Sequence, residues 1–277
     1  MYRVPALAVL LAAPLSAAGV VLDASFPPDR RPYLQMVANE VLEAVHQRFG
    51  VDPPINLPIS CYRSYDIPIT SFDNWQHPTK ILIGLNVDGL YYAQITYQLG
   101  HELGHIMLDP RRSNGIVETI CVALSLDVLD ALFQKWGSRV PYANQILVQF
   151  APHFKEYREE QERTVLYRFP ENVRLAVEHR QWAIVQRYLQ DHRAEQEQLD
   201  QREIRSQKGR DIQMLGAIAL RSGPISWKDF IGMRNCTNPT SQVVPLHLKL
   251  PLTKPCIERL SPMLCRIGVG CVGRRGK

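Results

Sequence analysis

The sequence QITYQLGHELGHIMLDPRRSNGIVETICVALS, from Gln94 to Ser125, organises the rest of this chain. Its centre is the run His101-Glu102-Leu103-Gly104-His105. Apolar residues at spacings of three and four predict a helix from Leu90 to Leu108 around this run. Residues four apart lie on the same face of an α-helix, so the two imidazoles can point at one ion. The spacing therefore indicates a metal site that still lacks a third ligand.

That third ligand is expected on the helix that follows. Asp109-Pro110 ends the first helix, because proline cannot continue it, and a second, mostly apolar helix is predicted from Ile116 to about Trp136. Glu118 lies in this apolar helix, where a carboxylate is costly unless it is paired or bound to a metal. Glu118 is therefore the expected ligand, and Asp109 and Glu156 are the alternatives.

Zinc is the metal that these residue types indicate. Zn²⁺ with three protein ligands keeps a fourth position for water, whose pKa falls to about 7, and a carboxylate beside it can act as a general base. We expect His101, His105 and Glu118 to bind Zn²⁺ and Glu102 to act as that base. The alternative is a helical structural protein in which the motif is a coincidence.

Upstream of the motif the sequence predicts one helix and a small set of strands. Apolar residues at helical spacing run from Leu34 to Phe49, and Gly50 is a suitable stop. Ile55 to Tyr62 and Ile67 to Phe72 are predicted strands with prolines that suit edges or turns. The clearest strand is Lys80 to Val87, a largely apolar run that ends at a turn.

Downstream of the motif the pattern is mainly helical, and we expect these helices to cover the first half. Helices are predicted from Gln145 to Phe169, from Asn172 to about Gln207 and from Asp211 to Arg221. The second of these carries one apolar stripe, formed by Val173, Val177, Ile184 and Tyr188. Alternating leucines predict a possible short final strand around Leu246, Leu248, Leu250 and Leu252.

The predicted fold class is α+β, with a small sheet packed on the motif helix and a largely helical C-terminal part. The chain has 277 residues, of which 45% are hydrophobic and 21% charged, as expected of a globular protein with a real core. The predicted parts are a signal segment at 1–24, a catalytic core at 25–140, a helical part at 141–222 and a Cys-bearing tail at 223–277.

The N-terminus has the pattern of a secretory signal. Met1-Tyr2-Arg3 precedes an uncharged apolar run from Val4 to Leu22, and Ser16-Ala17-Ala18 fits a cleavage site after Ala18. We expect a secreted or periplasmic protein; an uncleaved anchor or a first core helix in a cytoplasmic protein is the alternative. Beyond Leu22 no segment is long and apolar enough to span a bilayer, so no stable membrane insertion of the mature chain is expected.

The cysteine content and the net charge limit which disulfides and which partners can be expected. The even number of cysteines, six, allows disulfides in a secreted chain, and six cysteines permit 15 pairings, so the connectivity is open. The net charge of +5 comes from 32 basic and 27 acidic residues spread along the chain. With no recognised binding module, nucleic acid is not an expected partner.

The quoted residues resemble the zincin metallopeptidases, and among them the gluzincins, whose third ligand is a Glu on the following helix. The metzincin pattern is absent, because Leu108 and Arg111 stand where that family has Gly and His. The motif followed by Glu118-Thr119-Ile120-Cys121-Val122-Ala123 most resembles the compact ImmA/IrrE-type peptidases, over about Ile81 to Leu132. The resemblance implies a minimal zincin-like core, in which Val122 departs from the acidic residue found at that position in thermolysin-like sites.

The expected function is therefore that of a zinc metalloendopeptidase acting on a peptide or protein substrate. By resemblance to zincins, the edge of the strand Lys80 to Val87 is expected to bind an extended substrate. Oxyanion stabilisation by a residue of the second half is expected as well, with four open candidates: Tyr142, His153, Tyr157 and Tyr167. The other reading is a non-catalytic metal-binding or interaction protein with a zincin-like core.

Overall fold

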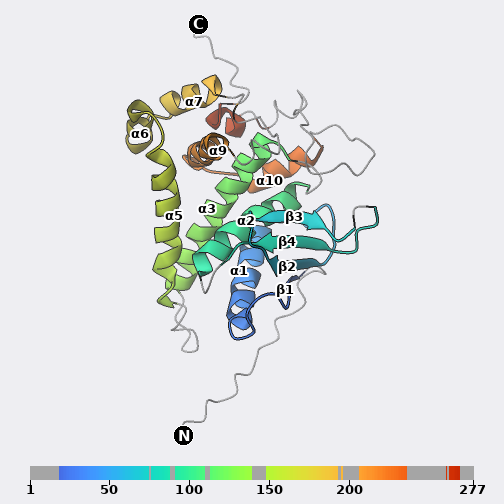
Figure 1. Ribbon diagram of the computed structural model, residues 1–277. Coiled ribbons are helices and arrows are strands. Elements are labelled where there is room, and N and C mark those ends of the chain that lie inside the picture. Colours follow the sequence, from blue (N-terminus) through green and yellow to red (C-terminus); the bar gives the residue numbers. More distant parts are fainter. Residues whose placement is uncertain are drawn as a thin grey trace.

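The computed structural model confirms the α+β class: a four-stranded mixed sheet lies against a larger set of helices (Figure 1). The structure describes residues 19–74, 76–87, 91–109, 113–138, 148–192, 195, 206–235, 260 and 262–268. Within these residues the buried hydrophobic side chains form one cluster that extends from Val20 to Ile267. The helices of the second half therefore share a core with the sheet and the motif helix.

The sheet contains β1 (Val20–Leu22), β2 (Ile59–Arg63), β3 (Ile69–Phe72) and β4 (Ile81–Leu85). Their order is β1-β2-β4-β3. The strands β1, β2 and β4 are parallel, and β3 runs antiparallel to them. The expectation that the strand at residues 80–87 offers its edge to a substrate is wrong. Here β4 lies between two strands, because β3 folds back onto it and occupies that edge.

One face of the sheet is packed against helices. Residues along β4 alternate, and Ile81, Ile83 and Leu85 are fully buried on that face. Thr70 of β3 is paired with Ile83, so its side chain lies on the same buried face. This register brings a hydroxyl group from the outer strand to the motif helix.

The first helix, α1 (Arg31–Phe49), confirms the sequence prediction and ends at Gly50, whose φ of 64° is the left-handed conformation that glycine favours. Its Gln35 side chain contacts β1 twice: Oε1 accepts from Leu22 N at 2.9 Å, and Nε2 donates to Val20 O at 2.7 Å. Residues 20–22 fall inside the segment predicted as a signal, yet they form a strand of the sheet.

The motif helix α2 (Tyr92–Leu108) and the ligand helix α3 (Gly115–Ser138) confirm the two helices predicted from sequence. They lie close together because glycines on α2 face α3. A Cβ on Gly104 would meet Cys121 Sγ at 2.9 Å, and a Cβ on Gly100 would meet Ser125 Cα at 3.4 Å. The close approach brings the first turn of α3 near the two histidines.

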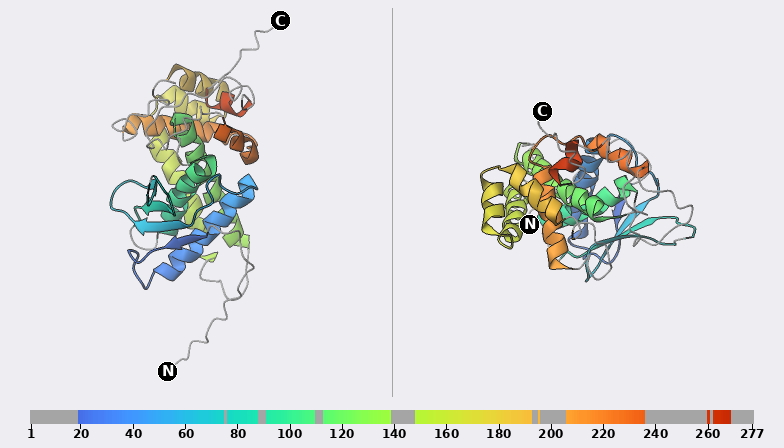
Figure 2. Two further views of the ribbon diagram at one scale, coloured as in Figure 1. Left: turned by 90° about the vertical axis from the view of Figure 1, so that its right-hand side faces the viewer. Right: turned by 90° about the horizontal axis from the view of Figure 1, so that it is seen from above.

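Two helices of the second half pack on α3. Both α5 (Ala151–Leu166) and α9 (Gln207–Leu220) contact it. Figures 1 and 2 show α9 with α6 (Glu171–Glu178) and α7 (Trp182–Asp191) at the end of the molecule away from β1. The segments α10 (Trp227–Phe230) and η2 (Ile231–Asn235) follow.

The prediction of a single helix over residues 172–207 is wrong, because the structure has two helices, α6 and α7, at the start of this range. Arg180 has a φ of 55° between them, and Gln181 N donates to Ala176 O at 2.7 Å while Arg180 N donates to Val177 O at 3.1 Å. This pair of hydrogen bonds is a Schellman motif, which ends α6. The predicted stripe is thus divided, and Ile184 is 42% exposed.

Two further expectations concern the remaining chain. The possible strand at residues 246–252 lies outside the described residues. Among the helices that the structure describes, none combines the length and the apolar character needed to cross a membrane.

Candidate metal centre

The two histidines lie where α2 faces α3. Helix α2 buries most of its residues, including His105, which is 7% exposed, whereas the His101 side chain is 19% exposed. Their Nε2 atoms are 3.2 Å apart. The four-residue spacing on a buried helix has therefore directed both imidazoles to one point.

Glu118 reaches the same point from the first turn of α3. Asn114 begins this helix, because its Oδ1 accepts hydrogen bonds from Ile116 N and Val117 N at 2.9 Å each. Ser113 Oγ donates to Glu118 Oε1 at 2.5 Å. The helix start and its preceding serine thus fix the position of the carboxylate.

The Nε2 atoms of both histidines and the two carboxylate oxygens of Glu118 lie close together. His101 Nε2 lies 3.2 Å from Glu118 Oε2, and His105 Nε2 lies 3.4 Å from Glu118 Oε1. Ligands at about 2.0–2.1 Å from a tetrahedral ion are about 3.3 Å apart. The separations between neighbouring ligand atoms, 3.2 to 3.4 Å, are close to that spacing.

His101, His105 and Glu118 could hold a metal ion. We call this group the metal centre. Neither alternative ligand belongs to it: the Asp109 charge acts on Arg234, and the Glu156 side chain is 67% exposed and contacts His153.

Charges within the metal centre are strongly coupled. Burial opposes ionisation of both His105 and Glu118. Nevertheless, Cys121 and Glu118 raise the pKa of His105 well above its ordinary value, and His105 together with His101 holds the pKa of Glu118 well below its own. The charged forms of His105 and Glu118 therefore stabilise each other, and a bound cation would stabilise the ionised carboxylate in the same way.

Glu102 lies beside the metal centre and is not part of it. Its side chain is 4% exposed, and its Oε2 accepts a hydrogen bond of 2.7 Å from Thr70 Oγ1 on β3. Glu102 also lines the pocket that His101 and Glu118 line. A carboxylate held next to a metal centre and open to the same pocket can accept a proton from a group bound there.

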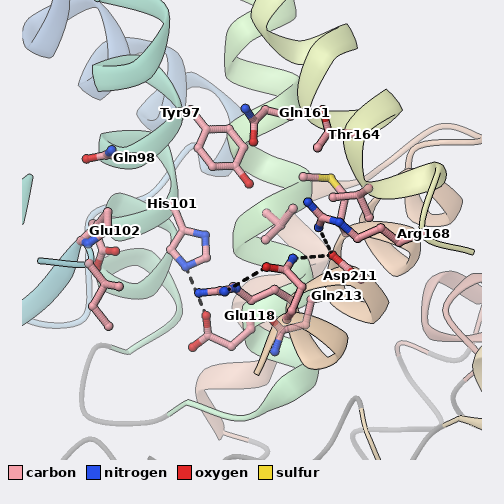
Figure 3. Close-up of a pocket in the computed structure, with 17 residues that line it drawn as sticks. Tyr97, Gln98, His101, Glu102, Glu118, Gln161, Thr164, Arg168, Asp211 and Gln213 are labelled. Carbon is pink, nitrogen blue, oxygen red and sulfur yellow. Dashed lines mark hydrogen bonds and ion pairs between the residues drawn. The ribbon is translucent and has the colours of Figure 1, made fainter. Parts of the chain in front are cut away.

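The pocket beside the metal centre has a volume of about 390 Å³. One wall consists of α2, the start of α3 and the residues that lead into β3, Ile67 and Pro68. The facing wall comes from α5 and α9, and Figure 3 shows Arg168 and Asp211 on that side, opposite His101. The helices of the second half therefore close the site that the first half builds.

Residues on this second wall were missed by sequence reasoning: Gln161, Arg168, Arg210, Asp211 and Gln213. They lie on α5, just after it, or on α9, all remote in sequence from the motif, and no local pattern marks them. The candidates for oxyanion stabilisation that the structure describes do not line this pocket. His153 and Tyr157 line another pocket, Tyr167 is 69% exposed, and Tyr142 is outside the described residues.

Comparisons of the chain with protein-family models, with curated proteins and with solved structures returned no match. The assignment of the metal centre therefore rests on the geometry of His101, His105 and Glu118.

Proposed function

We propose that this chain is a zinc-dependent metallopeptidase with a gluzincin-like site. The observation that carries the proposal is the convergence of His101, His105 and Glu118 from two helices, with Glu102 open to the same pocket. Glu102, which follows His101 in sequence, is buried and lines the pocket together with His101 and Glu118. The pocket volume of about 390 Å³ suits part of a peptide.

The donor set favours zinc over other common metals. Two imidazole nitrogens and one carboxylate oxygen are ligands of catalytic zinc sites, which keep a further position open. Calcium and magnesium prefer oxygen ligands throughout. Zinc bound here would supply a Lewis acid and a water of lowered pKa.

The residues of the chain supply the other parts of the mechanism. Glu102 acts as the general base, and Thr70 orients its carboxylate from the outer strand by the hydrogen bond to Oε2. A peptide lies in the pocket between the residues that lead into β3 and the wall formed by α5 and α9. Glu102 would take a proton from the attacking water as the water oxygen bonds to the peptide carbonyl carbon. It would then pass this proton to the nitrogen of the leaving amine as the C–N bond breaks.

The deciding experiment compares the wild type with Glu102→Gln, after metal-free purification and addition of zinc. Proteolysis should be abolished while near-stoichiometric zinc is kept, because Glu102 is not a ligand. Glu156→Gln, on an exposed side chain, is the matched control and should leave both unchanged. Undiminished proteolysis in Glu102→Gln would exclude the proposed mechanism, and no zinc binding by the wild type would exclude the site.

A second candidate is a non-catalytic metal-binding protein. The buried state of Glu102 and its hydrogen bond to Thr70 favour it, because a carboxylate so placed also has a structural use. The same experiment separates the two candidates. A wild type that binds zinc and cleaves no peptide in a broad library supports the second.

We also propose that the protein acts outside the cytoplasm. The apolar N-terminal run supports this, as does Cys265, which is disulfide-bonded. Cleavage after Ala18 would leave β1 (Val20–Leu22) in the sheet. Mass spectrometry of the exported protein should therefore find Gly19 at the N-terminus, and a chain that still begins at Met1 would contradict this.

A further inference from the structure

We infer that the pocket beside the metal centre selects peptides that carry a carboxylate close to the bond to be cleaved, and that Arg210 binds this carboxylate. The inference rests on the proposed function and names its class of substrate. It is carried by the charges on the wall formed by α9 and the end of α5.

The acidic groups of the pocket already have partners. Asp211 Oδ1 accepts from Arg168 Nη1 at 2.7 Å and from Gln207 Nε2 at 2.8 Å. Glu118 belongs to the metal centre, and Glu102 accepts from Thr70. The wall carries a further cation, which is paired with none of these three carboxylates.

Arg210 is that further cation. Its side chain is exposed and lines the pocket, and its Nη2 donates to Gln207 Oε1 at 3.1 Å. Within the described part of the chain, no carboxylate is paired with Arg210. Gln207 binds Arg210 through its oxygen and Asp211 through its nitrogen, so the guanidinium is held at the wall by a neutral group and keeps its charge.

A guanidinium group is well suited to bind a peptide carboxylate. Its planar fork donates two parallel hydrogen bonds to the two oxygens. The pocket volume of about 390 Å³ equals a sphere about 9 Å across, which an extended chain at about 3.3–3.6 Å per residue crosses in about three residues. A carboxylate bound by Arg210 is thus within about three residues of the metal centre.

Two groups could supply that carboxylate: the C-terminus of a peptide, or an aspartate or glutamate side chain. The experiment uses four peptides of otherwise identical sequence, with Asp or Asn at one internal position, each with a free or an amidated C-terminus. Isothermal titration calorimetry measures their binding to the zinc-loaded Glu102→Gln variant. The peptide that gains affinity from its charge identifies the source of the carboxylate.

A carboxylate should tighten binding about tenfold or more, as expected for a charge-assisted hydrogen bond. Arg210→Ala should remove this gain, and Arg210→Lys should keep part of it, because the charge remains and the fork is lost. Lys208→Ala is the matched control: it removes an exposed positive charge from the same helix outside the pocket. Its carboxylate preference should equal that of the parent.

Equal binding of charged and neutral peptides, a preference that survives Arg210→Ala, or no binding of any of the four overturns the inference. The proposed function is judged separately by cleavage with the wild type. Cleavage without a carboxylate preference refutes the role of Arg210 and leaves the peptidase proposal intact. Carboxylate-dependent binding without any cleavage refutes the peptidase proposal and supports Arg210 as a binding residue.

Discussion

Thr70 Oγ1 donates a hydrogen bond of 2.7 Å to Glu102 Oε2, which joins the outer strand of the sheet to the residue next to the first histidine. Both residues are 4% exposed. A buried carboxylate that loses its donor bears the full desolvation penalty. This contact therefore links the stability of the sheet edge to the position of Glu102.

Replacement of Thr70 by Val should lower the free energy of unfolding by about 1.5–3 kcal/mol, since valine keeps the shape and removes the donor to a charged group. Urea denaturation measures the change, and Thr70→Ser, which keeps the hydroxyl, is the control. In a Glu102→Ala background the same replacement should have a much smaller effect. An equal effect in both backgrounds would show that the hydrogen bond does not contribute.

Glu118→Ala should weaken zinc binding by more than about 100-fold, because residues outside the ligand shell already change affinity by about 10–100-fold. Competition with a chromogenic chelator measures this. Glu156→Ala is the control, because Glu156 is exposed and pairs with His153 rather than with the metal centre. Equal affinity of the two variants would remove Glu118 from the ligand set.

Ser113→Ala should weaken zinc binding by about 10–100-fold, since Ser113 Oγ donates to Glu118 Oε1 and orients the carboxylate. Ser125→Ala is a matched control: Ser125 is also buried, but its hydroxyl donates to the backbone oxygen of Cys121. Its zinc affinity should equal that of the wild type. The idea that Ser113 positions the ligand would not survive a loss of affinity in both variants alike.

Asp73 should make the stability of the β3–β4 loop depend on pH. Hydrogen bonds from Thr79 in the first place lower the pKa of Asp73 from 3.8 to about 2. A carboxyl whose pKa is lower in the folded state stabilises the fold when ionised, so its contribution is complete above pH 3.8 and disappears as the pH falls through about 2. The difference in urea midpoint between wild type and Asp73→Asn should shrink over that window.

The assignment of this window can be checked independently. Thr79→Ala should raise the pKa of Asp73 toward its ordinary value in an NMR titration, because the Thr79 hydroxyl donates to Asp73 Oδ2. A pKa that does not move would assign the shift to another group.

Deletion of residues 1–24 should lower the free energy of unfolding by about 3 kcal/mol or more relative to deletion of residues 1–18. The longer deletion removes Val20 and Leu22, whose buried side chains contribute about 1.5–3 kcal/mol each. Thermal and urea denaturation of the two truncated proteins provide the comparison. Equal stability would show that β1 is dispensable.

The helices of the first half were predictable because their signals are local. Periodic apolar residues define α1 and α2, and Gly50 supplies the expected left-handed stop. The break between α6 and α7 was not predictable, since Arg180 adopts the left-handed conformation there in place of glycine or asparagine. Packing between α6 and α7 stabilises a left-handed backbone conformation at Arg180 that the local propensity of arginine disfavours.

The sequence by itself determined the half of the site that depends on helical periodicity. Spacing alone puts His101 and His105 on one face, and an apolar helix makes Glu118 conspicuous. Only the tertiary structure decided that Glu118 meets the histidines, that β3 rather than β4 is the outer strand, and that Arg168 and Arg210 form the opposite wall. These relationships join residues remote in sequence, and they follow from how the sheet and helices bury a shared core, which no local pattern encodes.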